Sequence, residues 1–166
     1  MPTDLKGWHQ GERTIQGKLG FGDAIRMSYT YNSSYMPEQH RVFHTSNIPF
    51  IPVTILDESG RPWGSVFAGK GGEVGFVKSS DERSLSMDLV SWEGDPLLRN
   101  LGGWRKDEKG RVLAAGIGIE LSTRRRNKFA GWIENSSVGN STTDVHLEMH
   151  VNQALGLVWN QEFHFA

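Results

Sequence analysis

The densest charge in the chain lies in residues 123–131, where the cations Arg124, Arg125, Arg126 and Lys128 occupy four of five positions. This basic segment directly follows an apolar, glycine-spaced run over residues 114–121, as expected of a strand that leaves the core. Guanidinium groups bind phosphate through charge-assisted, paired hydrogen bonds. Because the net charge of the whole chain is only -1, the cluster is local, which favours a small phosphorylated ligand over nucleic acid. A solvated strand end whose arginines pair with carboxylates is the alternative, and the sequence leaves both open.

Histidines in two places have spacings that occur in metal sites. His146, Glu148 and His150 alternate and therefore share one strand face, but same-face neighbours are about 7 Å apart. His40 and His44 have the helical i, i+4 spacing without the adjacent glutamate of a zinc protease motif. A polar outer strand face is the favoured interpretation of the first group. The sequence therefore predicts no metal site, and it identifies no catalytic residue.

The composition limits the class of protein. The chain has 166 residues and no cysteine, which excludes disulfides and thiol chemistry. No apolar run approaches the roughly 20 residues that a membrane-spanning helix needs, and the first residues do not resemble a signal peptide. We therefore expect a cytoplasmic protein with a small-molecule substrate and no membrane or nucleic-acid partner.

Alternating and β-branched patterns predict a mainly β protein. Short strands closed by glycine or Asp/Ser turns favour a small antiparallel barrel or sandwich of about six strands. The first 35 residues are expected to form an N-terminal extension with a short helix at 12–19, and residues 36–166 the single β domain. Further helical segments are expected at 36–44 and 95–101. The strand candidates are residues 50–56, 61–69, 74–78, 84–90, 112–121, 129–134 and 143–152.

The order of several short motifs resembles a known family. The motifs occupy residues 7–12, 36–41, 50–53, 60–65, 75–77, 94–97 and 120–128. Each motif alone is weak, but in this order, over most of the chain, they resemble the pyridoxamine 5′-phosphate oxidase-like family of FMN-binding split barrels. The similarity is greatest to a branch of flavin-nucleotide-binding proteins that are sometimes fused to a reductase domain.

The resemblance implies a six-stranded antiparallel split β-barrel with a few short helices. It also implies a homodimer with FMN in the groove between two barrels. The implied activity is that of an FMN-dependent oxidoreductase acting on a small organic substrate, for which NAD(P)H is a candidate electron donor.

The resemblance also implies which residues contact the flavin. The Arg-Pro-Trp strand would lie along the ring, the strand after the glycine turn would meet the phosphate, and Arg126 with Arg124 on the same strand face would add a further contact. Trp63 and Trp104 are candidates to border a planar ligand. The implied cofactor-binding residues are Trp63, Ser65, Val66, Phe67, Ala68, Phe76, Val77, Lys78, Ser79, Arg83, Arg124 and Arg126.

Two departures from the family pattern keep alternatives open. Relatives in this branch often carry a Phe-Gly-Asn-Cys-Pro motif near the C-terminus, and the corresponding residues 153–160 contain neither cysteine nor proline. Residues 70–73 replace a more apolar, proline-containing turn. A diverged barrel without FMN is therefore the alternative, either as a binding module for another ligand or protein, or as a cofactor-free enzyme of specialised metabolism.

Overall fold

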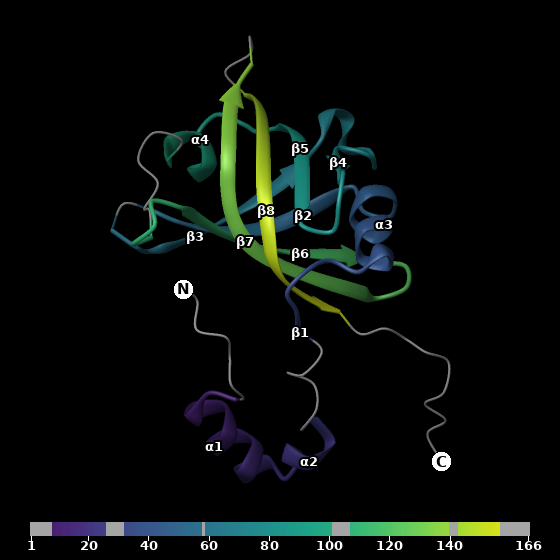
Figure 1. The fold of residues 1–166 in the computed structure, drawn as a ribbon, viewed down its shortest axis with the longest axis vertical. Coiled ribbons are helices and arrows are strands. Elements are labelled where there is room, and N and C mark those ends of the chain that lie inside the picture. Colours follow the sequence, from purple (N-terminus) through teal and green to yellow (C-terminus); the bar gives the residue numbers. More distant parts are fainter. Residues whose placement is uncertain (1–7, 26–31, 58, 101–106, 140–142, 157–166) are drawn as a thin grey trace. The chain divides into compact units, whose positions relative to one another are not determined.

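The structure is a computed structural model that describes residues 8–25, 32–57, 59–100, 107–139 and 143–156 (Figure 1). Its contacts divide the chain into two compact units, Met1–Asn32 and Ser33–Ala166. No helix within the described residues combines the length and apolar character needed to cross a membrane.

The first unit contains two short helices, α1 (Gln10–Leu19) and α2 (Gly22–Ile25). A capping box sets the start of α1: the His9 ring accepts a hydrogen bond from the backbone of Gly11, and the His9 backbone donates to the Glu12 carboxylate at 2.8 Å. The helix therefore begins two residues before the predicted position. Gly20 ends it in the left-handed conformation, which glycine adopts without strain.

The second unit is built on one antiparallel sheet. Its path runs β3-β2-β6-β7-β8-β5-β4, so that β6, β7 and β8 form the centre; a two-residue strand β1 (Asn32–Ser33) lies off this path. The mainly β prediction is confirmed, but the count of six strands is wrong, because the path itself contains seven. The strands are β2 (Phe50–Leu56), β3 (Pro62–Ala68), β4 (Val77–Lys78), β5 (Ser84–Val90), β6 (Val112–Glu120), β7 (Arg125–Val138) and β8 (Asp144–Gly156).

The strands β7 and β8 are longer than their sequence patterns predicted. Register shifts between Ala130 and Gly131 and between Ile133 and Asn135 interrupt the regular pairing of the two strands. Such bulges bend a strand and increase its twist while the ladder continues on either side. They also change which residues share a face, which obscures the period-2 signal in the sequence.

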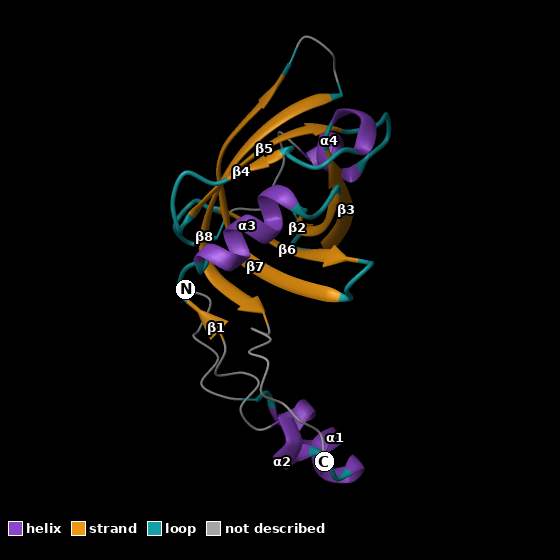
Figure 2. Ribbon diagram, turned by 90° about the vertical axis from the view of Figure 1, so that its right-hand side faces the viewer, coloured by secondary structure: helices purple, strands orange, loops and turns teal. Residues whose placement is uncertain are grey.

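The sheet curls so that its two edges approach each other (Figure 2). The strand β3 is not hydrogen-bonded to β5, but residues of the two are in contact. At the end of β3, a Cβ added to Gly69 would lie 2.5 Å from the Cβ of Phe76, so only glycine fits at this approach. The curled sheet is a half-barrel, which agrees with the expected barrel class.

Two helices of the second unit lie against the sheet. The helix α3 (Glu38–Ser46) packs Phe43 and His44 against the position of Gly118 on β6. The helix α4 (Pro96–Asn100) contacts β3. Both confirm predicted helical segments, and a short 3-10 turn (Lys70–Gly72) follows β3.

Candidate functional site

The polar groups of the implied flavin strand, β3, are mostly engaged with residues of the same unit. The Trp63 indole donates to the Asp57 carboxylate at 2.9 Å, and hydrogen bonds from Trp63 and Arg61 hold the pKa of Asp57 well below its ordinary value. The buried Ser65 hydroxyl donates to Asp95 at 2.8 Å. Val66 is 41% exposed, so it is the β3 candidate that directs an apolar side chain to solvent. The remaining candidates on this strand are Phe67, which lies in the core, and Ala68, which is half-buried.

The implied phosphate group around β4 is also engaged internally. The Arg41 guanidinium, from α3, donates to the Ser79 hydroxyl at 3.1 Å and to the Ser79 carbonyl at 3.0 Å. Arg83 donates to the Ser34 carbonyl at 3.1 Å, and the Lys78 ammonium pairs with Asp88 at 3.1 Å. The last two candidates of this group are the buried apolar residues Phe76 and Val77.

The exposed carboxylate of Asp81 accepts hydrogen bonds from further donors of this loop. It accepts hydrogen bonds from the backbone N–H of Arg83 at 2.7 Å, from Ser84 at 2.9 Å and from Ser80 at 3.2 Å. These bonds, with that from Arg83 the largest cause, lower the pKa of Asp81 from its ordinary value. A ligand phosphate placed at this loop would lie beside the negatively charged Asp81 carboxylate, which already accepts the hydrogen bonds of these donors. We name residues 78–84 with Arg41 the engaged basic group.

The basic segment after β6 is arranged differently from the sequence expectation. We expected Arg124 and Arg126 to share a strand face, and this is wrong: Arg124 lies in the turn with a positive φ of 60°, and β7 begins at Arg125. Arg125 points inward, where its guanidinium lies 5.0 Å from the ring centroid of Phe43 and donates to the Gln39 carbonyl at 3.4 Å. The next residue, Arg126, points to the opposite, outward face of β7 and is exposed.

Three cations of this segment form no ion pair, hydrogen bond or ring contact through their side chains with any described residue. They are the exposed residues Arg124, Arg126 and Lys128, and we name them the free basic group. Arg126 and Lys128 share the outward face of β7, about 7 Å apart along the strand. Long side chains at this separation can reach one anion together. No hydrogen bond, ion pair or ring contact joins the free and the engaged basic group within the part of the chain that the structure describes.

The strand β6 lies in the interior of the sheet, and the side chains on its outward face are apolar. Its inward positions are buried, and its outward positions are the partly or fully exposed residues Leu113, Ala115, Ile117 and Ile119. The register places Ile117 directly beside Lys128, and Ile119 directly beside Arg126. Cross-strand neighbours have Cβ atoms about 5 Å apart, so each free cation borders an apolar side chain. We name these four residues, with Ala130, Arg126, Lys128 and Trp132, the β6–β7 face.

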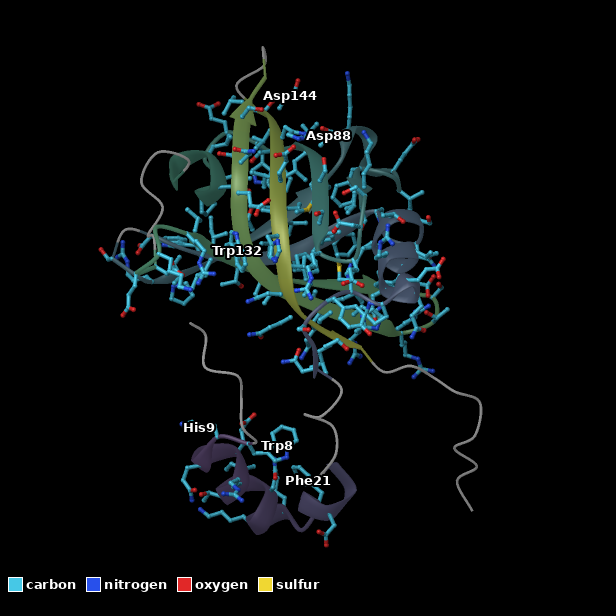
Figure 3. All side chains as sticks on the ribbon, in the orientation of Figure 1. Trp8, His9, Phe21, Asp88, Trp132 and Asp144 are labelled. Atoms are coloured by element: carbon cyan, nitrogen blue, oxygen red, sulfur yellow. The ribbon has the colours of Figure 1, made fainter. Side chains whose placement is uncertain are left out.

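An aromatic stack lies at the end of the β6–β7 face that is opposite the free basic group. Trp132 is labelled in Figure 3; its ring is stacked with that of His150 at 4.2 Å between centroids and an interplanar angle of 17°. The Arg111 guanidinium lies 4.4 Å from the Trp132 ring centroid. The face thus combines an apolar wall, an aromatic border and free cations, which is the chemistry that a planar anionic ligand requires.

A cleft of about 460 Å³ lies where the end of β3 meets β5 and the β7–β8 hairpin. Of the implied cofactor-binding residues, Phe76 lines this cleft, next to Gly69, which directly follows β3. Its charged lining consists mainly of carboxylates, from Glu73, Asp88 and Asp144, against one ammonium, from Lys70. The His146 ring lies 2.7 Å from Asp88. This charge balance disfavours a phosphate in the cleft.

Other expectations concern metal ions and residues outside the described ranges. The described residues contain no group of three or more His, Cys, Asp or Glu side chains placed to hold a metal ion. Trp104, a candidate border for a planar ligand, lies outside the described residues. So do residues 157–160 of the stretch compared with the family's C-terminal motif.

Sequence reasoning missed the apolar part of the β6–β7 face. Ile117, Ile119 and Lys128 were not among the implied contacts. The available signal was the absence of polar alternation in residues 112–119, since antiparallel strands with one solvated face normally alternate. The basic segment was recognised, but which of its cations face outward depends on where β7 begins.

Several solved structures are similar to this chain at low sequence identity. No protein-family model matches the chain, and no curated protein matches it significantly. Among solved structures, HupZ of Group A Streptococcus has a TM-score of 0.48 at 12% identity, covering 74% of this chain and 94% of that one. A variant of HupZ gives 0.49 at 8% identity over 74% and 99%, and an F420 reductase gives 0.44 at 11% over 71% and 95%. Similarity at this level does not define the fold or the function of this chain.

Proposed function

We propose that the protein is a homodimeric split barrel of the pyridoxamine 5′-phosphate oxidase-like type that binds FMN at the β6–β7 face. It would act as an FMN-dependent oxidoreductase on a small organic substrate, with NAD(P)H as the electron donor. The observation that carries the proposal is the apolar outward face of a central strand placed directly beside unpaired cations.

The apolar outward side chains favour a second layer over this face. Exposed polar side chains normally cover the solvent side of an antiparallel sheet, and a contiguous apolar patch indicates a binding surface. Leu121, in the turn beside the cations, is 73% exposed. A second copy of the chain and a planar ring between the copies would bury these groups together.

The free basic group fits the phosphate of FMN. Arg126 and Lys128 offer charge-assisted donors that no described carboxylate occupies, and Arg124 adds a third cation in the turn. Ile117 and Ile119 would contact the ring system, and Trp132 would border it. Bound FMN would supply two-electron redox chemistry, and the protein side chains would hold and orient it.

One observation favours the second candidate, a flavin-free ligand-binding module on the same barrel. The loop in which the family resemblance puts the phosphate is filled by the Asp81 carboxylate and by the Arg41–Ser79 hydrogen bonds. A protein that had lost FMN would retain such internal pairing. This candidate would use the acidic cleft around Asp88 in place of the β6–β7 face.

Flavin content tests the proposal. The purified protein is examined for flavin absorbance, and colourless protein is titrated with FMN while flavin fluorescence is followed. Saturable binding near one FMN per protomer, weakened in Arg126→Ala but not in Arg13→Ala, supports the proposal. Arg13 is an exposed arginine of α1 and serves as the matched control. No binding at tens of micromolar FMN overturns it in favour of the flavin-free module.

A further inference from the structure

A buried polar cluster lies beneath α3. It consists of His40 and His44, one helical turn apart on α3, and Asn127 on β7, with exposed fractions of 3%, 1% and 0%. The buried atoms His40 Nδ1, both ring nitrogens of His44 and both side-chain amide atoms of Asn127 have no hydrogen-bond partner among the described residues. Unpaired polar groups at this depth cost stability, so their retention needs an explanation.

The cluster is closely packed. A Cβ on Gly156 would lie 2.1 Å from Asn127 Oδ1 and 2.7 Å from His40 Nε2, and one on Gly118 would lie 2.9 Å from His44 Cε1. The His44 ring also meets the Phe129 ring edge-on at 5.1 Å. The imidazoles therefore lie in close contact with the sheet, and no described carboxylate pairs with either ring.

Among the described residues, the charged group that acts on both imidazoles is another cation. Arg125, at the start of β7, lies beside both histidines. The part of β8 that packs against them contributes the uncharged residues Ala154 and Gly156. The other charged groups on the surrounding elements point elsewhere: Arg41 to Ser79, Glu120 of β6 to Asn47 and Thr123, and Glu38 and Asp81 to the exposed surface.

Burial and Arg125 therefore act in the same direction. Both lower the pKa of His40, and burial, His40 and Arg125 lower the pKa of His44 to about 3 from 6.5. The folded protein holds both imidazoles neutral under conditions in which exposed imidazoles are protonated.

We propose that α3 is an acid-sensitive clasp: it docks on β6, β7 and β8 only while His40 and His44 are neutral, and their protonation releases it. Release would also break the hydrogen bonds of Arg41 to Ser79 and of Arg125 to Gln39, because both depend on the docked helix. Acid would thereby loosen the engaged basic group and the start of β7. This regulatory role does not depend on FMN binding.

The direction and size of the effect follow from linkage. A base with a lowered pKa in the docked state binds its proton only after release, so docking is strongest above pH 6.5 and weakens as the pH falls toward the folded pKa. Each histidine that gains a proton on release makes the opening equilibrium about tenfold more favourable per pH unit. Two histidines acting together would give about a hundredfold.

Amide hydrogen exchange of the full-length protein between pH 7.5 and 5 tests the clasp. Protection factors, corrected for the intrinsic pH dependence of exchange, are compared between peptides of α3 and of the central strands. We expect α3 protection to fall about tenfold to a hundredfold per pH unit below pH 6, while protection of β2 stays constant. Constant α3 protection across this range would overturn the proposal.

Variants assign the effect to the buried imidazoles. His40→Gln and His44→Gln combined should keep α3 protection nearly independent of pH, and His146→Gln, which changes a half-exposed histidine, should leave the loss intact. An unchanged loss in the combined variant contradicts the proposal. If that variant does not fold, NMR titration of the wild-type imidazoles replaces it, and normal titration of both rings near pH 6.5 without loss of α3 contacts would be equally contradictory.

Discussion

The engaged and the free basic groups contain similar residues in opposite states. Around β4, Arg41 and Arg83 donate to carbonyl and hydroxyl groups of the same unit, and Asp81 neutralises the loop. At the start of β7, Arg126 and Lys128 have no partner among the described residues and border apolar side chains. A cation that is internally paired stabilises the fold, whereas an unpaired cation beside apolar surface is available to a ligand.

The difference follows from the elements that present each group. The engaged group lies in a tight loop against α3, where short hydroxyl side chains and backbone carbonyls are within reach of each guanidinium. The free group extends from the flat outward face of two paired strands, where the nearest neighbours are Ile117 and Ile119. Local density of acceptors, more than the number of arginines, decides which cations can bind a phosphate.

The largest expected effect concerns the apolar wall beside the free group. Ala115→Arg places a long cation at an exposed outward position of β6, so the protomer should fold normally. Burying that cation unpaired in a dimer should cost about 3–5 kcal/mol. Sedimentation analysis should then find monomers, while Ser46→Arg, at an exposed position of α3, should remain dimeric. A dimeric Ala115→Arg variant would remove this face from the proposed interface.

The next effect separates the free group from the fold. Arg126→Ala should weaken FMN binding by about 1–3 kcal/mol, as for loss of a hydrogen bond to a charged group. Its thermal and chemical stability should be unchanged, because the Arg126 side chain has no partner among the described residues. Combining it with Lys128→Ala should weaken binding further, and fluorescence titration measures both. Unaltered affinity in the combined variant would rule out these residues as the phosphate site.

The engaged group should show the reverse behaviour. Arg41→Ala removes two partly buried hydrogen bonds to Ser79 and should lower the free energy of unfolding by about 1–2 kcal/mol. FMN affinity should stay within twofold. Urea unfolding followed by circular dichroism measures the first quantity, with Arg13→Ala as the control. A loss of FMN affinity without a loss of stability would reverse the roles assigned to the two groups.

The smallest effect is a pH dependence confined to the engaged loop. The pKa of Asp81 is lowered, so its hydrogen bonds are fully present above pH 3.8 and are lost as the pH falls through the lower folded value. NMR shifts of the Arg83 and Ser84 resonances should therefore show a titration step below pH 3.8, separate from the change near pH 6 that release of α3 would cause. Residues of the free group should not follow this titration, since no described hydrogen bond or ion pair joins them to Asp81. Movement of the Arg126 resonances over the same pH range would show that the free basic group responds to protonation of Asp81, contrary to this prediction.

Much of the fold was predictable because its signals are local. Residues 50–56 and 84–90 form strands at exactly their predicted bounds, since β-branched or alternating residues there end in turn signals. The helix predicted at 36–44 from Pro37 and Glu38 at its start is found at 38–46. The lengths of β7 and β8 were not predictable, because the two strands continue past bulges in their pairing. The free energy that a bulge costs is offset by hydrogen bonds between strands, and these depend on which distant segments pair.

The candidate site was predictable in part. The concentration of cations at residues 124–128 was evident, but the inward turn of Arg125 and the outward turn of Arg126 follow from the strand beginning at Arg125. The buried positions of His40 and His44 were not expected, since their helical spacing alone does not say which face meets the sheet. The implied contacts on β3 and β4 rest on resemblance and stay predictions.

The mainly β class, the turns, a helix near residues 36–44 and a local basic segment could be predicted from the sequence, because each depends on residues close together in the chain. Three properties became apparent in the folded structure: which cations are paired, the apolar face of β6 beside Arg126 and Lys128, and the enclosure of two imidazoles beneath α3. These properties arise from register and burial between segments far apart in sequence. The free energy of such a contact depends on which two residues pack together, and a local sequence pattern does not specify the distant residue.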